Sequence, residues 1–188
     1  MTVTKPSGVV DGDVLVAEFN TPSKPSVSTV PSGWTAVISP VSSGANTVFA
    51  YSHVVSNASS EPSSYTFGLS TTATWNAGVS DYHGVDTTNP WDTAASTQAN
   101  TTAAATITVP GITTASAGAL VIGGVGLNSS GYSVTPPSGY TEDWESTGAQ
   151  VAELAHHAMP TAGATGDVTF KLGGSRAAGA WLRALRPA

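Results

Sequence analysis

Residues 12–17 read Gly12-Asp13-Val14-Leu15-Val16-Ala17, and residues 118–123 repeat the pattern as Gly118-Ala119-Leu120-Val121-Ile122-Gly123. Four further blocks recur in the same order: residues 2–6 at 106–110, 31–35 at 137–141, 65–67 at 168–170 and 77–79 at 178–180. The five spacings lie between 101 and 106 residues. Composition bias alone would not hold five blocks in register, so the pattern predicts a duplicated unit.

The unit is built of β-strands. The 12 prolines and 20 glycines cut the chain into runs of five to nine residues, a spacing typical of sandwiches and barrels. In the first half we expect strands near 2–5, 13–20, 34–39, 47–55, 64–70 and 75–85. In the second half we expect them near 105–109, 118–127, 140–146, 150–158, 167–172 and 177–186.

Hydrophobic patterning indicates how the strands pack. Residues 65–70 and 167–172 alternate apolar and polar side chains, which is typical of strands with one buried face. Residues 14–17 and 120–122 are apolar on both faces and therefore belong in strands covered on both sides. The sequence predicts an all-β, antiparallel, jelly-roll-like sandwich made of two pseudo-repeats of about six strands each.

The 188 residues can form one domain or two small ones. Each half is short, poor in large side chains and without cysteine, and small isolated domains of that kind are marginally stable. We therefore expect a single unit over residues 1–188, with halves 1–86 and 105–188 joined by 87–104. Two small sandwiches are the alternative, and the joining segment reads as an extended crossing or a mobile linker.

Composition excludes several classes of function. A net charge of −6 does not suit a nucleic-acid-binding protein, which needs a basic surface. Without cysteine, disulfides and thiolate metal sites are absent. No apolar run reaches the roughly 20 residues of a membrane helix, and residues 1–6 do not resemble a signal peptide. The chain contains no phosphate-loop, zinc or dinucleotide motif, and we expect no cofactor.

Groups capable of acid–base chemistry are few. His53 and His156 lie 103 residues apart, as equivalent positions of the two repeats, and could form a paired site or serve in packing. Asp81 and His83 share a strand face like two members of a hydrolase triad, yet no Gly-x-Ser-x-Gly elbow supplies a nucleophile. A polar strand end is the simpler interpretation of this pair.

Two acidic groups could also bind ligands. Asp143 and Glu145 alternate on one predicted strand face with Trp144 opposite, as a sugar-cleaving carboxylate pair would require. An acidic edge that discourages aggregation explains the same residues. Asp11 and Asp13 could bind calcium, but Asp-Gly-Asp mainly indicates a turn. We assign no catalytic residue and no metal ligand.

Aromatic and basic residues define the expected contact surface. Trp91 follows the Asn89-Pro90 turn without a counterpart in the other half, and tryptophan is favoured at interfaces. No acidic residue follows Asp167, so the last strand forms a local basic edge that could dock an acidic partner or balance acids elsewhere. The candidate contact residues are Trp91, Trp144, Arg176, Arg183 and Arg186.

The order of the motifs resembles that of β-sandwich domains in tailed-phage virion proteins. The resemblance covers nearly the whole chain and rests on Lys5-Pro6, residues 12–17, Pro31-Ser32-Gly33-Trp34, Glu61-Pro62 followed by residues 65–67, and Gly84-Val85-Asp86 followed by Asn89-Pro90. It implies a non-enzymatic virion part such as a capsid decoration, head fibre or tail appendage. Asp13 becomes Ala119 in the second half, and nothing there corresponds to Gly84-Val85-Asp86, which argues against functional equivalence of the halves.

The sequence therefore favours a phage structural protein that decorates the capsid, or a tail part, by docking to major capsid or tail proteins. It is expected to be a homo-oligomer located in the virion, with no nucleic-acid or membrane partner. The first alternative is an adhesion module that binds a host-surface glycan through Trp91 or Trp144, and the second is a glycan hydrolase.

Overall fold

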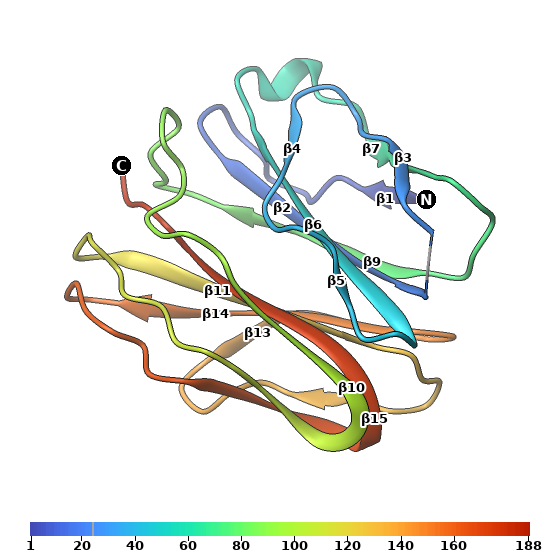
Figure 1. Cartoon of the computed structure of the whole chain (residues 1–188). Helices are drawn as coiled ribbons and strands as arrows, with labels where there is room; N and C mark the ends of the chain where they lie inside the picture. The colour runs from blue at the N-terminus through green and yellow to red at the C-terminus, as the bar shows by residue number, and fades with distance from the viewer. Residues whose placement is uncertain (24) are drawn as a thin grey trace.

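The computed structural model describes residues 1–23 and 25–188 and is composed almost entirely of antiparallel strands (Figure 1). The first half contains β1 (Thr2–Thr4), β2 (Val14–Pro22), β3 (Val27–Thr29), β4 (Trp34–Ala36), β5 (Val41–Ser42), β6 (Asn46–Val54), a 3-10 turn (Ala58–Ser60), β7 (Ser64–Thr66), β8 (Gly68–Leu69) and β9 (Asn76–Tyr82). The second half contains β10 (Ser96–Val109), β11 (Ala119–Leu127), β12 (Val134–Thr135), β13 (Thr141–Thr147), β14 (Val151–Met159) and β15 (Val168–Leu185). The predicted all-β sandwich is confirmed.

Each large sheet comes from one half of the chain. The first has the strand order β4-β6-β2-β9, with β5 beside β6, and the second has the order β10-β15-β11-β14-β13, with β12 beside β15. The two sheets lie one above the other in Figure 1. Between them lies an apolar layer to which both halves contribute, including Val16, Ala50, Ile122, Leu154 and Trp181.

A second apolar layer lies on the outer side of each large sheet. In the first half, the β1-β7 pair covers Leu15, Ala17 and Phe19 of β2. In the second half, the ends of β10 and β15 fold back, so that Phe170 packs with Val125 of β11. The central strands β2 and β11 are therefore buried on both faces, as their continuous apolar runs predict.

The last strand is longer than the sequence predicts. Residues 167–172 and 177–186 were expected as two strands, but β15 runs without a break from Val168 to Leu185. A Cβ atom on Gly173 would lie 2.6 Å from the Ser133 carbonyl oxygen, and one on Gly174 would lie 2.3 Å from the Tyr132 ring. These glycines let β15 bend closely past residues 132–133 and change layers, together with β10 (Figure 1).

The two halves share one pattern of strand pairing. β2 lies between β6 and β9, as β11 lies between β14 and β15. Thr2 and Thr66 share a hydrogen bond between their hydroxyl groups across β1 and β7, and Thr108 and Thr169 share one across β10 and β15. By this register Thr2 corresponds to Thr108 and Val79 to Leu182, so the predicted matches of residues 2–6 with 106–110 and of 77–79 with 178–180 are each wrong by two residues. The shared pairing pattern is what duplication would produce, although duplication itself and the jelly-roll description stay predictions.

Most of the other predicted strands are found within a few residues of their expected ends. The short strands β3, β5 and β12 were not predicted, because two or three residues cannot display a periodicity. Residues 96–104 of the joining segment belong to β10, so this part is an extended crossing and not a linker.

Polar side chains also join the halves. The Asn20 amide donates to the carbonyl oxygens of Leu127 and Val151, each at 2.9 Å. The Asn46 amide donates to the Asn20 side-chain oxygen at 2.7 Å and to the Gly126 carbonyl oxygen at 2.9 Å. Both asparagines are fully buried, so the two halves are held by directional bonds as well as by apolar contact.

Candidate functional site

A cleft with several polar side chains lies where two sheet edges meet. This seam cleft, of about 470 Å³, is lined by residues 77–82 of β9 and 143–146 of β13. The Tyr82 hydroxyl donates a hydrogen bond to Asp143 Oδ2, and the other oxygen of Asp143 lies 2.5 Å from His156 Nδ1. Burial, followed by the Asp143 charge, raises the pKa of Tyr82 well above its usual value, so this phenol stays protonated.

A β-bulge overturns the predicted carboxylate pair. The register of β13 on β14 shifts between Glu142 and Trp144, so Asp143 is an extra residue. Asp143 consequently turns toward Tyr82, whereas Glu145 Oε1 accepts the Val134 N–H of β12 on the other face of the sheet. Both residues line the seam cleft, but their carboxylates are bonded to different elements and do not form the predicted pair, and Trp144 lies on the Asp143 side, not opposite it.

Trp144 is a packing residue of the seam. A Cβ atom on Gly78 would lie 2.4 Å from its ring, which shows that the indole rests against the β9 backbone. The indole N–H has no hydrogen-bond partner among the described residues. Trp91 is half-buried, and the Arg183 guanidinium lies 4.5 Å from its ring centroid, a cation–π geometry. Both tryptophan rings therefore pack within the chain, whereas the sequence predicts that they contact a partner.

The three candidate arginines are used within the chain. Arg176 lies over the Tyr132 ring and donates to the Tyr132 hydroxyl at 3.2 Å. Arg183 donates to the carbonyl oxygens of Thr93 and Val37, which joins the connecting segment to the first half. These contacts engage both guanidinium groups within the chain, whereas the sequence predicts a basic edge that is free to bind a partner.

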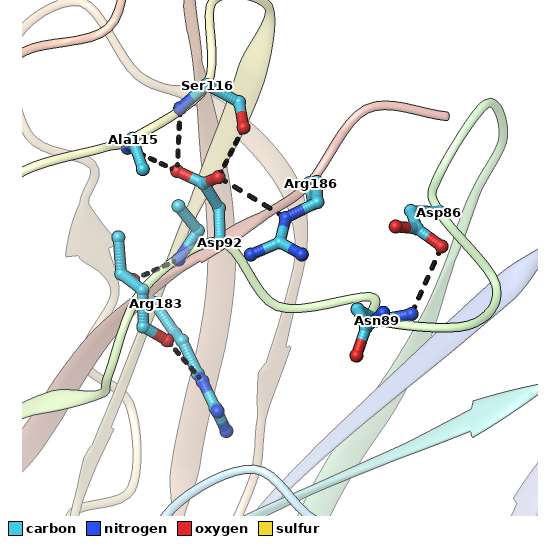
Figure 2. A network of polar contacts seen from close by, with 9 residues as sticks. Asp86, Asn89, Asp92, Ala115, Ser116, Arg183 and Arg186 are labelled. Atoms are coloured by element: carbon cyan, nitrogen blue, oxygen red, sulfur yellow. Dashed lines mark hydrogen bonds and ion pairs between the residues drawn. The ribbon is translucent and has the colours of Figure 1, made fainter.

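The connecting segment is fixed by one buried carboxylate, Asp92 (Figure 2). Asp92 accepts hydrogen bonds from the N–H groups of Ala115 and Ser116 and from the Ser116 hydroxyl at 2.6 Å. Arg186 Nε lies 3.6 Å from the same carboxylate. Burial opposes ionisation, but these hydrogen bonds and the Arg186 charge outweigh it and lower the pKa of Asp92. Arg186 therefore serves a structural contact.

The structure also corrects the histidine pairing. Leu15 lies opposite His53, whereas the equivalent residue Val121 lies opposite His157. His53 Nδ1 contacts the Gly33 carbonyl oxygen and His157 Nδ1 contacts that of Gly139. His157, not His156, is thus the counterpart of His53, and both support a glycine turn. The prediction of a paired site at His53 and His156 is wrong, because a one-residue difference in spacing reverses the strand face.

Two buried glutamates were missed by the sequence reasoning. Glu18 is fully buried between the sheets and accepts a hydrogen bond of 2.6 Å from the Trp181 indole N–H. Glu153 is also fully buried, and neither of its oxygens has a hydrogen-bond partner among the described residues. Burial, with added repulsion from Glu142 and Glu145, raises the pKa of Glu153 to about 8. The sequence feature that could have identified both glutamates is an acidic residue within a run of apolar strand residues.

The structure places a third residue, Asp13, beside the predicted Asp81–His83 pair. His83 Nδ1 lies 2.6 Å from Asp13 Oδ1, and His83 Nε2 lies 3.9 Å from Asp81 Oδ2. Among the described residues no serine hydroxyl is bonded to His83, so the arrangement does not form a Ser-His-Asp triad. Asp11 caps the Ala58 N–H, in keeping with its interpretation as a turn residue.

Comparison with known proteins adds no relative. No protein-family model, no curated protein and no solved structure matches this chain. Among the described residues, no helix is long and apolar enough to cross a membrane.

Proposed function

We propose that this protein is a non-enzymatic structural subunit of a phage virion, a capsid decoration or tail part that docks to neighbouring protein subunits. The sequence motifs supply the phage assignment, and the physical support comes from the free edges of the sheets. An exposed edge strand presents unpaired N–H and C=O groups to any strand that approaches it.

The edge formed by β10 is the observation that carries this proposal. β10 is 14 residues long, and seven of its side chains are exposed. It contains neither a charged residue nor a proline, and it lies within an uncharged stretch that runs from Thr93 to Thr141. Natural sheets normally protect a long edge with charge, proline, shortness or bulges. β10 has register shifts between Asn100 and Thr106, but its regular stretches on either side carry no charge or proline and therefore favour addition of a partner strand.

The remaining edges are protected in those ways. β13 carries Glu142, Asp143 and Glu145, β9 carries Asp81, and β4 is three residues long. A second copy paired through β13 would place acids against acids, which is unfavourable. A strand paired through β10 meets no charge, so this edge suits a neighbouring subunit, including another copy of the chain.

The proposal is tested with charged edge variants. Thr97→Lys/Thr101→Lys adds two charges to β10, and Thr71→Lys/Thr72→Lys adds the same charges to the exposed loop before β9. Light scattering coupled to gel filtration gives the oligomeric state, and co-sedimentation measures binding to particles of a phage that encodes the chain. Only the β10 variant is expected to lose association. Equal binding by both variants, or no binding by the unmodified protein, would contradict the proposal.

Glycan adhesion is the second candidate, and Trp75 is the residue that favours it. Trp75 is 38% exposed, beside a shallow hollow of about 250 Å³ that also includes Thr71 and Thr72. An exposed indole can stack on a sugar ring. Host polysaccharide should quench the tryptophan fluorescence of the unmodified protein but not that of Trp75→Ala. Equal quenching of both proteins, or none of either, would remove this candidate.

A further inference from the structure

A cluster of possible metal ligands lies at one end of the first large sheet. Asp13 directly precedes β2, Asp81 is near the end of β9, and His83 follows β9. β2 and β9 are antiparallel neighbours with Val14 opposite Tyr82, so continuation of the ladder places Asp13 opposite His83. Asp81 is two residues from His83 and shares its face of the strand. The sheet thus gathers three side chains that are far apart in the sequence.

The spacing of their donor atoms is close to that of a metal site. One ligand atom from each of Asp13, Asp81 and His83 can be chosen so that all lie within 4.8 Å of one another. Tetrahedral ligands at metal bond lengths of about 2.0–2.2 Å are roughly 3.3–3.6 Å apart. A small rotation of the exposed imidazole, whose side chain is 64% exposed, would close the difference.

A second observation is a buried carboxylate oxygen that no hydrogen bond satisfies, although His83 lies beside both carboxylates. The Asp81 side chain is only 10% exposed, and its Oδ1 has no hydrogen-bond partner among the described residues. Asp13 is 2% exposed, and one of its carboxylate oxygens lies within 4.8 Å of one of Asp81. No lysine or arginine forms an ion pair with either carboxylate among the described residues.

A cleft gives solvent access to Asp13 and His83, whereas Asp81 lines the neighbouring seam cleft. The cleft at Asp13 and His83 has a volume of about 540 Å³ and is lined by residues 10–13 and 83–87 together with Ala188. Asp11, Asp13 and Asp86 face this space, and its lining contains no lysine or arginine. A negatively charged opening attracts cations.

We infer that Asp13, Asp81 and His83 bind a divalent transition-metal ion such as Zn²⁺ or Mn²⁺, with water at the remaining positions. The imidazole nitrogen favours these ions over Ca²⁺ and Mg²⁺, which prefer oxygen ligands. The ion joins the start of β2 to the end of β9, so it stabilises the folded protein. The second half has no such site because Ala119 and Ala184 occupy the places of Asp13 and Asp81.

Metal titration of the tag-free full chain tests this inference. After treatment with EDTA and its removal, calorimetry should show one equivalent of Zn²⁺ or Mn²⁺ bound and much weaker binding of Ca²⁺. Thermal unfolding should shift to higher temperature as the ion is added. Co²⁺ offers a direct spectroscopic report, because its visible absorption changes when protein ligands replace water.

The variants separate this site from general metal binding. His83→Ala changes an exposed side chain and should weaken Zn²⁺ binding at least tenfold, as should Asp81→Asn. His156→Ala is the matched control, since that histidine also contacts one aspartate, Asp143, which is not one of the proposed ligands. The inference fails if His83→Ala binds like the unmodified chain, if His156→Ala is weakened equally, or if 1 mM Zn²⁺ does not bind.

Discussion

Replacing Glu153 by glutamine should make the protein less sensitive to alkaline pH. The side chain lies on β14 between Val125 and Glu145, fully buried. Its pKa is raised from 4.5 to about 8, so the folded protein holds a proton that the unfolded chain releases at neutral pH. A carboxyl group with a raised folded-state pKa contributes fully below the unfolded value, and that contribution is lost as pH rises toward the folded value.

The size of the effect follows from the two pKa values. Each unit of pH between the two pKa values lowers the free energy of unfolding by about 1.4 kcal/mol. From pH 6 to pH 8 the unmodified protein should therefore lose about 2 kcal/mol through Glu153. Glu153→Gln keeps a similar shape and cannot ionise, so this part of the loss should disappear.

Urea unfolding of both proteins at pH 6, 7 and 8 measures the difference in slope, in which the other titrating groups largely cancel. Glu142→Gln is the comparison, because it removes an exposed negative charge on the neighbouring strand that raises the pKa of Glu153 less than burial does. It should change the slope only slightly. If Glu153→Gln and the unmodified protein lose the same free energy between pH 6 and pH 8, the carboxyl is not buried in its neutral form and the reasoning is refuted.

Two further predictions concern the contact between the halves and the connecting segment. A Cβ atom on Gly124 would lie 1.6 Å from Glu18 Oε2 and 2.3 Å from Trp181 Nε1, so Gly124→Ala should destabilise the protein by about 3 kcal/mol. Gly163→Ala, with no atom within 4 Å of its added Cβ, should change the thermal midpoint little, and equal shifts would argue against close packing of the sheets. The lowered pKa of Asp92 means that its contribution is present above the unfolded value of 3.8 and is lost as pH falls below it. Asp92→Asn should therefore cost about 1–3 kcal/mol in urea unfolding at pH 7 and less at pH 3, and a cost independent of pH would show that the charge is not involved.

The candidate sites were less predictable than the strands. Asp81 and His83 share a strand face by simple alternation, and that pairing is visible in the sequence. Asp13 joins them only because β2 lies beside β9 in the sheet. The bulge that separates Asp143 from Glu145 has no glycine to mark it, so alternation placed both carboxylates on one face.

The sequence alone determined the all-β class, the main strands and the double burial of the two central strands. These properties depend on local turn residues and on a periodicity of two, which are written along the chain. Only the tertiary structure decided that Arg183 and Arg186 serve internal contacts, that His157 matches His53, and that Glu18 and Glu153 are buried. Those outcomes depend on register and on which faces meet, and a displacement of one residue reverses every side chain of a strand.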